Sequence, residues 1–383
     1  MRRVAVIAVA QTKHARHRPD MTPTQTVYGV CKEVVAKAGI RREEIDFTAA
    51  GSADYLEGRP FSFGQALRYE GAWPPISETH LEMDGAWAAY YAWIRLQTGN
   101  YDTALITSWN KSSEASLHHV LSITMDPFYE AAIGIDPIAL AAMQARAYMS
   151  RSGVTSEQMA KVAVKNRKNA KNNPCAQVKG DVTVEQVLSS PMFSDPLHLM
   201  DCPPITDGAV AIILAAEGKA EELCPNPAWI TGVHHATDSG VMGFRDLGEI
   251  PAAKIAADKA YEMAGIRDPL HELDVAEISD VFTHQELMLY EAFGFCDRGQ
   301  GGKLIDSGAT EVGGEIAVNP SGGCLATDPI MCRGMLRLGE AALQIMGEAE
   351  DRQVPNVKKA LAHCAYGHCL QSNMVWIMEA NNA

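Results

Sequence analysis

Residues 38–41, Ala-Gly-Ile-Arg, decide the fold, because the same four residues recur at positions 264–267. Each copy follows an amphipathic helical pattern and precedes an acidic turn and a short apolar strand pattern. A glycine just after the last apolar position of such a pattern is a typical helix stop. The copies lie 226 residues apart (265 − 39), and the matched order of elements favours an internal duplication over a chance identity. Two related halves are therefore expected to meet near residue 225.

The first copy sits in a region where strand and helix patterns alternate. Apolar runs predict strands at residues 3–10, 45–51, 101–109 and 210–215, and helical spacing predicts helices at 24–38 and 83–97. This alternation is typical of an α/β fold. Residues 113–200 break the rhythm and are interpreted as an inserted loop subdomain. The expected organisation is one half over residues 1–225, with the loop subdomain at about 113–200, and a second half over 226–383.

Composition excludes several classes of protein. The chain has 383 residues and a formal net charge of −14, which disfavours binding to nucleic acid. No apolar run of about 18 residues is present, so no membrane span is expected. The first ten residues read as a buried strand rather than a signal peptide. Nine scattered cysteines favour free thiols in a cytoplasmic protein.

The spacing of Cys364 and Cys369, with His363 and His368 between them, invites a zinc interpretation. No second pair with ligand spacing follows, so no metal is expected.

Four segments resemble the thiolase superfamily, most closely its sterol-carrier-protein-X and lipid-transfer-protein branch, and the resemblance covers nearly the whole chain. They are Asp-Cys-Pro-Pro-Ile-Thr-Asp-Gly-Ala (201–209), Ser-Asp-Val-Phe-Thr (279–283), Val-Asn-Pro-Ser-Gly-Gly (318–323) and Leu-Ala-His-Cys-Ala-Tyr-Gly (361–367). The resemblance implies a five-layered αβαβα sandwich of two βαβαβ halves. It also implies a CoA thioester as substrate, with coenzyme A as part of that substrate and no other cofactor bound.

The catalytic positions depart from the family. A thiolase carries a nucleophilic cysteine at the N-terminus of a buried helix, and Glu82 stands at that position here, or Asp84 if the register slips by two residues. Neither register supplies a thiol, because the nearest cysteines are Cys31 and Cys175. Two interpretations of Glu82 stay open: an active-site base or charged mimic of the acyl group, and a helix cap.

Three further candidates are carried over from the resemblance. Ser279 replaces a histidine of the family and serves either as a small filler or as a hydrogen-bond donor. Asp328 replaces the basic histidine and serves either as a base or as the cap of the helix predicted after it. Cys364 lies where some thiolases transfer a proton, and the alternative is an inert buried thiol. His363 is a candidate for proton transfer, but if residues 362–365 form a strand, His363 and Cys364 face opposite ways.

Substrate contacts are expected from the glycine-containing loops. Gly322, Gly323 and Gly367 allow close approach of a ligand to the backbone, with tight turns as the alternative; Tyr366 and His368 flank Gly367 in the last loop. The basic patch at 165–171 is either a solvated helix face or, from the resemblance, a contact to a CoA phosphate.

Two functions follow as expectations. The first is an enzyme that makes or breaks a C–C bond next to a CoA thioester, by retro-aldol or Claisen chemistry on a lipid, steroid or aromatic acyl group, without a cysteine acyl-enzyme. Steroid side-chain aldolases of this branch also lack the cysteine, but they carry a tyrosine at the position of Ser279. The alternative is a non-catalytic thiolase-like subunit that binds acyl-CoA within a hetero-oligomer.

The resemblance also implies an assembly. A homodimer is expected, joined through a sheet edge with the strand 101–109 near the two-fold axis. A small zinc-ribbon/OB-fold partner protein is expected as well, from the resemblance alone.

Overall fold

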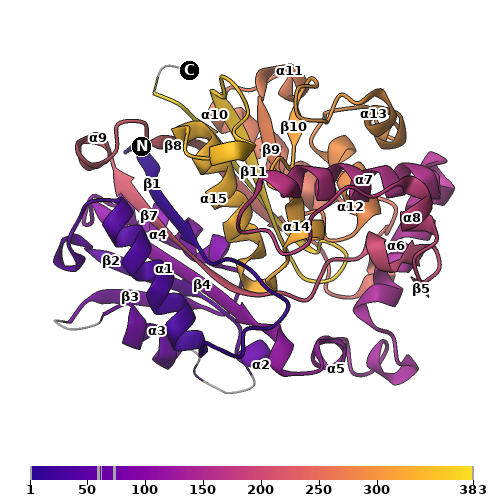
Figure 1. The fold of residues 1–383 in the computed structure, drawn as a ribbon, viewed down its shortest axis with the longest axis horizontal. Helices are drawn as coiled ribbons and strands as arrows, with labels where there is room; N and C mark the ends of the chain where they lie inside the picture. The colour runs from indigo at the N-terminus through magenta and orange to yellow at the C-terminus, as the bar shows by residue number, and fades with distance from the viewer. Residues whose placement is uncertain (1, 58–60, 62, 72–74, 382–383) are drawn as a thin grey trace.

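A computed structural model describes residues 2–57, 61, 63–71 and 75–381. Its described part contains one ten-stranded mixed sheet and a separate two-stranded sheet (Figure 1). The first half of the chain supplies β1 (Val4–Gln11), β2 (Phe47–Gly51), β3 (Ser77–Leu81), β4 (Thr103–Lys111) and β7 (Asp207–Ala216). The second half supplies β8 (Ala228–Thr237), β9 (Val275–Glu277), β10 (Ala317–Val318), β11 (Lys359–Tyr366) and β12 (Ser372–Glu379).

The strand order repeats between the halves, as the duplicated sequence predicts. It runs β1-β7-β4-β2-β3 in the first half and β8-β12-β11-β9-β10 in the second, so each strand has a counterpart at the same place. The halves join where β1 pairs antiparallel with β8, through Ala5 with Trp229 and Val6 with Ala228. The first half thus ends before β8, near the expected boundary.

Matching helices complete the duplication. The helix α1 (Pro23–Lys37) packs on β1 and β7, and its counterpart α10 (Pro251–Ala264) packs on β8 and β12. Thr22 begins α1 with a capping box, and Gly39 and Gly265 follow the two helices at φ +66° and +73°, a conformation that glycine adopts without strain. The sequence placed both helix stops correctly.

Two central helices lie between the halves. The helix α4 (Gly85–Gln97) packs on β2 and β4, α15 (Arg333–Met346) packs on β11 and β9, and the two helices contact each other. Every residue of α15 after Arg333 is buried, because the helix is covered on all sides. The central helices lie between the five strands of one half and the five strands of the other, and the outer helices cover the far sides. This is the expected five-layered α/β fold.

Residues between β4 and β7 form the loop subdomain. It contains α5 (Leu117–Ser122), α6 (Pro137–Ser152), α7 (Ser156–Asn169), α8 (Val184–Leu188), β5 (Met192–Ser194) and β6 (Leu197–His198). Its helices pack on α12 (Thr283–Ala292), α13 (Gly301–Ser307) and α14 (Gly323–Ala326) of the second half. The remaining short helices are α2 (Asp54–Glu57), α3 (Phe63–Tyr69), α9 (Lys219–Leu223) and α11 (Pro269–Glu272).

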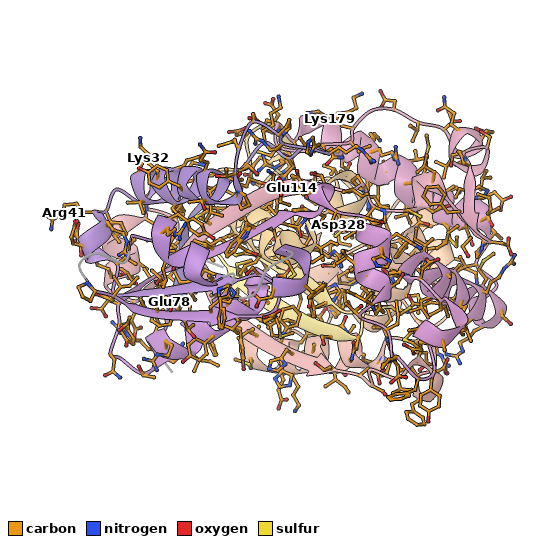
Figure 2. The ribbon with its side chains drawn as sticks, turned by 90° about the horizontal axis from the view of Figure 1, so that it is seen from below. Lys32, Arg41, Glu78, Glu114, Lys179 and Asp328 are labelled. Carbon is orange, nitrogen blue, oxygen red and sulfur yellow. The ribbon has the colours of Figure 1, made fainter. Side chains whose placement is uncertain are left out.

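The strand at 101–109, which was expected near the two-fold axis of a dimer, does not lie at an edge of the sheet. The strand predicted at 101–109 is β4, which pairs with β2 on one side and β7 on the other. A strand paired on both sides has no free edge for a second chain. At this end of the sheet the outermost strand of the described residues is β3, which the sequence patterns missed. Glu78 on β3 lies at the periphery in Figure 2, whereas Asp328 lies toward the middle.

No helix among the described residues is long and apolar enough to cross a membrane.

Candidate active site

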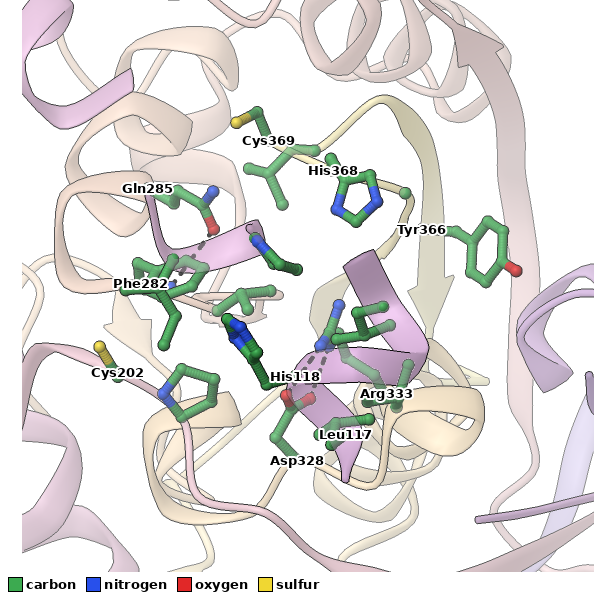
Figure 3. A pocket seen from close by; sticks show the side chains of 18 of the residues that line it. Leu117, His118, Cys202, Phe282, Gln285, Asp328, Arg333, Tyr366, His368 and Cys369 are labelled. Carbon is green, nitrogen blue, oxygen red and sulfur yellow. Dashed lines mark hydrogen bonds and ion pairs between the residues drawn. The ribbon is translucent and has the colours of Figure 1, made fainter. Parts of the chain in front are cut away.

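A cavity of about 460 Å³ lies between the loop subdomain and the second half (Figure 3). Several segments converge on it: α2, α5, the start of α6, β5, the loop at 202–205, the start of α12, residues 328–333, and the turn between β11 and β12. Apolar side chains cover much of its wall, among them Leu117, Leu121, Ile205, Val281 and Phe282. A mostly apolar pocket with a few converging polar groups is typical of a small-molecule site.

Asp328 and Arg333 form the charged part of the pocket. Arg333 Nε donates to Asp328 Oδ1 at 2.5 Å and Nη2 donates to Oδ2 at 2.7 Å. Burial opposes the charge of Arg333, but the neighbouring carboxylate outweighs it and raises the pKa of the guanidinium above its ordinary value. Among the described residues Nη1 of Arg333 has no hydrogen-bond partner, so the pocket retains a cationic donor.

Asp328 differs from both expectations. It does not cap α15, because its backbone N–H donates to Thr206 Oγ1 at 3.2 Å and both of its carboxylate oxygens accept from Arg333. A carboxylate held by a bidentate guanidinium is a poor base. The base that the sequence assigned to Asp328 must therefore be sought elsewhere in the pocket.

His368 lies in the turn between β11 and β12 and lines the pocket, as expected. Its Nε2 lies 2.9 Å from Thr124 Oγ1, and the Thr124 hydroxyl donates its own hydrogen to the carbonyl of Leu121 at 2.7 Å. Nε2 must therefore donate, which leaves the lone pair on Nδ1. Burial lowers the pKa of His368 below its usual value, so the ring is neutral at neutral pH.

Two tyrosines meet at one side of the pocket. The hydroxyl oxygens of Tyr366 and Tyr55 lie 3.2 Å apart, and the ring of Tyr366 packs edge-on against Trp87. Burial raises the pKa of both tyrosines, so both hydroxyls keep their protons and can donate them. Tyr366 and Gly367 were expected here, whereas Tyr55, on the four-residue helix α2, carried no sequence signal.

Two thiols line the cavity without being nucleophiles. Burial raises the pKa of Cys202 and of Cys369 to about 12, so both stay protonated at neutral pH. Gln285 completes the polar lining and donates through Nε2 to Gln144 Oε1 at 2.8 Å.

The N-terminus of α4 holds no thiol, as the sequence indicated. Glu82 is exposed, does not line the pocket, and accepts the backbone N–H of Asp54 at 2.9 Å. The cap of α4 is Asp84 rather than Glu82, since Asp84 Oδ1 accepts the N–H of Ala86 at 2.8 Å. The structure therefore supports neither the catalytic nor the capping interpretation of Glu82.

Asp84 joins the two central helices. Its carboxylate also accepts the N–H groups of Gly334 at 2.8 Å and Met335 at 3.2 Å, in the first turn of α15. Burial raises the pKa of Asp84 to about 7, and the three N–H groups work against that rise. The residue is fully buried outside the pocket, so its geometry supports a structural role and gives no support to a catalytic one.

Ser279 and His363 are sealed in the core, away from the pocket. The Ser279 hydroxyl donates to the carbonyl of His363 at 2.8 Å, and the Ser279 N–H donates to His363 Nδ1 at 3.3 Å. His363 Nε2 lies 3.0 Å from Asn373 Oδ1, and burial lowers the pKa of the ring to about 4. Both nitrogens are occupied, so the geometry does not support the proposed catalytic roles of these residues.

Cys364 faces the opposite side of β11, as strand alternation predicts. Its Sγ lies 3.2 Å from the carbonyl oxygen of Gly334, beside Asp84. Burial raises the pKa of this thiol well above its ordinary value. The inert interpretation of Cys364 is the one that the geometry supports.

Gly322 and Gly323 lie behind the pocket rather than in it. A Cβ on Gly323 would lie 2.3 Å from Asp280 Oδ1, and one on Gly322 would lie 2.6 Å from the Cβ of Ala170. These glycines allow α14 to approach Asp280, which accepts the N–H of Cys324 at 2.6 Å. Their role is close packing, so the expected substrate contact is not supported.

The basic patch at 165–171 is divided. Lys165 is buried and donates to Glu286 Oε1 at 2.8 Å and to the carbonyl of Val318 at 2.9 Å, so it is neither solvated nor available to a phosphate. Lys168 and Lys171 pair with Glu311 and Asp181 at the surface. Asp280 lies in the same buried group of charged residues as Lys165 and Glu286. Burial and the charge of Glu286 raise the pKa of Asp280 to about 8.

Residues 234–380 match the family described as thiolase C-terminal domain-like. An acetyl-CoA acetyltransferase of Methanothermobacter thermautotrophicus is 32% identical over 372 residues, which cover 95% of this chain and 96% of that protein. This chain belongs to the thiolase superfamily. Sterol carrier protein 2 of Homo sapiens, 30% identical over 392 residues (95% of this chain, 70% of that protein), places it in the SCP2-thiolase-like branch. A solved structure named Ltp2-ChsH2(DUF35) aldolase superposes with a TM-score of 0.85 at 24% identity over 99% of this chain and 98% of that chain.

The cavity of this chain holds a cation, a neutral histidine and two tyrosine hydroxyls. Carboxylates stand at the N-terminus of α4, where the resemblance led us to expect the nucleophile position. Sequence reasoning missed three residues of the site: Arg333, which lies five residues after Asp328, Thr124 and Tyr55. The last two lie on short segments whose position depends on the folded loops.

Proposed function

We propose that this chain is a thiolase-fold enzyme that makes or breaks a C–C bond next to a CoA thioester without a cysteine acyl-enzyme. The observation that carries the proposal is the pairing of a free Nδ1 on His368 with a cationic donor on Arg333 in one pocket. Retro-aldol cleavage needs a base and a group that stabilises an enolate, and it needs no nucleophilic thiol.

In the proposed step His368 takes up a proton, Tyr366 donates one, and solvent carries the proton from His368 back to Tyr366. Nδ1 of His368 takes the proton of a β-hydroxyl, the O–H electron pair forms a carbonyl, and the bond between Cα and Cβ breaks. Its electrons form the enolate of the shortened thioester, whose oxygen Arg333 Nη1 stabilises. The hydroxyl of Tyr366 then gives its proton to Cα, and the proton held by His368 returns to the tyrosine through solvent. The products are a ketone or aldehyde and a shorter acyl-CoA.

Asp328 has a supporting part in this proposal. The bidentate pair fixes the plane of the guanidinium and leaves Nη1 as the donor that is free for substrate. Removal of Asp328 would leave Arg333 charged but mobile.

The apolar wall of the pocket suits a hydrophobic acyl group. Leu117, Leu121, Phe282 and the two prolines at 203 and 204 line it, together with the Asp328–Arg333 pair. A lipid, steroid or aromatic acyl group carried on coenzyme A fits this division better than a short polar one.

Partners remain part of the proposal. The aligned structure named Ltp2-ChsH2(DUF35) aldolase has a two-component name and supports a hetero-oligomer, for which we propose the small zinc-ribbon/OB-fold partner that the resemblance implies. The edge strand β3 supports a homodimer.

The test is turnover of two thioester classes by the purified chain, alone and with the small partner. A β-hydroxyacyl-CoA with a bulky apolar acyl group should release a carbonyl compound and a shorter acyl-CoA, detected by liquid chromatography. A β-ketoacyl-CoA with added CoA tests the Claisen variant. His368→Gln should lower turnover roughly 100-fold or more, the usual scale for a general base. His118→Gln is the matched control, because that exposed histidine lines the same cavity and has no assigned role.

Loss of turnover in His368→Gln together with retained activity in His118→Gln would support the proposal. No turnover of either class, with or without the partner, would favour the non-catalytic subunit instead. The capture of both oxygens of Asp328 by Arg333 is the observation that favours this second candidate.

A further inference from the structure

The turn that carries His368 has an unfavourable backbone conformation. Gly367, Cys369 and Leu370 have φ of +81°, +51° and +54°. Glycine adopts such angles freely, but cysteine and leucine rarely do, so the surrounding structure must hold them there. The turn also lines the pocket along its whole length, so its shape decides where the ring of His368 lies.

Arg245 binds the turn from outside the pocket. Nη1 donates to the carbonyl of His368 at 2.9 Å and Nη2 donates to the carbonyl of Cys369 at 2.6 Å. Its side chain is 2% exposed, and Nε lies 3.6 Å from Asp238 Oδ2. A guanidinium with two parallel donors fits two successive carbonyls, a geometry that a single ammonium cannot reproduce.

Other contacts hold the far end of the turn independently. The N–H of Asp238 donates to the carbonyl of Gln371 at 2.9 Å, and Asn373 Nδ2 donates to the carbonyl of Leu370 at 2.8 Å. Gln144 adds a longer bond of 3.3 Å to the carbonyl of Cys369. Among the described residues, Arg245 alone supplies a side-chain donor to the carbonyl of His368 itself.

We propose that Arg245 is a positioning residue for His368. By fixing the two successive peptide groups 368–369 and 369–370, it holds the imidazole against Thr124 and keeps Nδ1 free in the pocket. Arg245 does not line the cavity, so it acts through His368 and not on the substrate. The proposal rests on the proposed function for its catalytic consequence, but the placement of the ring does not depend on it.

The test reads the His368 ring directly. Protein labelled with ¹³C and ¹⁵N in histidine is titrated by NMR, and His368→Gln assigns the signal. In the unaltered chain the ring should carry its proton on Nε2 and titrate below the ordinary 6.5. In Arg245→Met the ring should become a mixture of both tautomers, and its pKa should move up toward 6.5, because the ring leaves Thr124 and becomes more exposed.

Charged groups that face the ring bear on this titration. Glu130 raises the pKa of His368, while Arg245 and Arg333 lower it, so the loss of the Arg245 charge itself adds to an upward shift. Arg245→Lys separates the two effects, since it keeps the charge but loses the paired donors. It should give the mixed tautomers with a smaller change of pKa.

Arg151→Met is the matched control. Arg151 binds Asp246, the residue next to Arg245, and Glu249, and it makes no bond to the turn. This variant should leave the tautomer and the titration of His368 unchanged. A merely structural role of Arg245 predicts lower stability to urea in Arg245→Met with the His368 tautomer retained, and that result would overturn the proposal. If Arg245→Met does not fold, Arg245→Lys decides by the same readout.

A turnover measurement separates this proposal from the proposed function. With an active chain, Arg245→Lys should lower kcat roughly tenfold with little change in KM. If the unaltered chain turns over no thioester but the NMR signature still depends on Arg245, the proposed function fails and the positioning role stands. If turnover is normal and the His368 tautomer is the same in the Arg245 variants as in the unaltered chain, the positioning role is wrong and the proposed function stands.

Discussion

At the scale of single residues, one hydrogen bond decides which nitrogen of His368 can act as a base. The Thr124 hydroxyl donates its hydrogen to the carbonyl of Leu121, so it can only accept from Nε2 of His368. The lone pair of the ring is then on Nδ1. His363 differs from His368 because both of its nitrogens are occupied in the core. Of these two histidines, only His368 has a ring nitrogen available to a substrate.

Thr124→Val should lower turnover about tenfold or more, because the ring loses the acceptor that selects its tautomer. Steady-state kinetics with the best thioester from the panel gives the measurement. Thr98→Val is the control. The Thr98 hydroxyl likewise donates to the carbonyl three residues earlier at 2.7 Å, but Thr98 is the C-cap of α4 and does not line the pocket. Equal turnover in both variants would contradict the assignment of His368.

His363 makes stability depend on pH. Burial lowers its pKa to about 4, below the 6.5 of an unfolded histidine, so the unfolded chain takes up the proton first as the pH falls. The contribution of the neutral His363 ring to the free energy of unfolding is therefore complete above pH 6.5 and is lost as the pH falls toward 4. His363→Gln removes this dependence, so its stability relative to the unaltered chain should improve by up to about 2 kcal/mol from pH 7 to pH 5. Urea unfolding at the two pH values measures the difference, and a pH-independent difference would contradict the lowered pKa.

Sequence reasoning found part of the site at this scale and missed the rest for a physical reason. Tyr366, Gly367 and His368 line the pocket together because one short loop carries them, and their contact with a substrate stays a prediction. Asp328 was found, but its partner Arg333 was not, and the pairing reverses the role of Asp328 from base to support. Glu82 was ranked above Asp84, although only the folded chain shows which carboxylate turns inward.

At the scale of elements, Asp84 connects two helices from different halves. Its carboxylate caps α4 and also accepts two N–H groups in the first turn of α15. The N-termini of both central helices therefore meet at one buried carboxyl group, and their dipoles favour its ionised form against the burial that raises its pKa. Strand alternation in β11 was predictable from the sequence, but this junction was not, because its two sides are 250 residues apart.

Asp84→Ala should lower the free energy of unfolding by about 2–4 kcal/mol, because it removes two caps and leaves three buried N–H groups without an acceptor. Urea unfolding followed by circular dichroism measures the change. Asp136→Ala is the control, since Asp136 caps only α6, through the N–H groups of Ile138 and Ala139, and should lower stability by about 1 kcal/mol. Equal losses in the two variants would contradict the double cap.

At the scale of the whole molecule, the duplication explains how much of the fold the sequence could predict. The repeated Ala-Gly-Ile-Arg stop marks equivalent helices, and the ten strands follow one order twice. The edge strand was missed because β3, Ser-Glu-Thr-His-Leu, shows no clear alternation of apolar and polar residues. Sheet position depends on pairing between distant strands, which apolar periodicity alone does not encode.

The edge strand β3 leads to a prediction about assembly. Its outer side has no strand partner within the described residues, and an unpaired edge is a natural pairing site for a second copy. Light scattering at micromolar concentration should give twice the chain mass of 41.4 kDa. A stable species at the single-chain mass would contradict the dimer.

The central claim is carbon–carbon bond chemistry without an acyl-enzyme, and intact-protein mass spectrometry during turnover tests it most directly. The chain is mixed with the β-hydroxyacyl-CoA that it cleaves, quenched in acid at several times within the first turnovers, and weighed. The account predicts an unmodified chain at every time while the carbonyl product and the shorter acyl-CoA accumulate. A transient gain equal to the acyl group, mapped to Cys202 or Cys369 in the pocket wall, would contradict it.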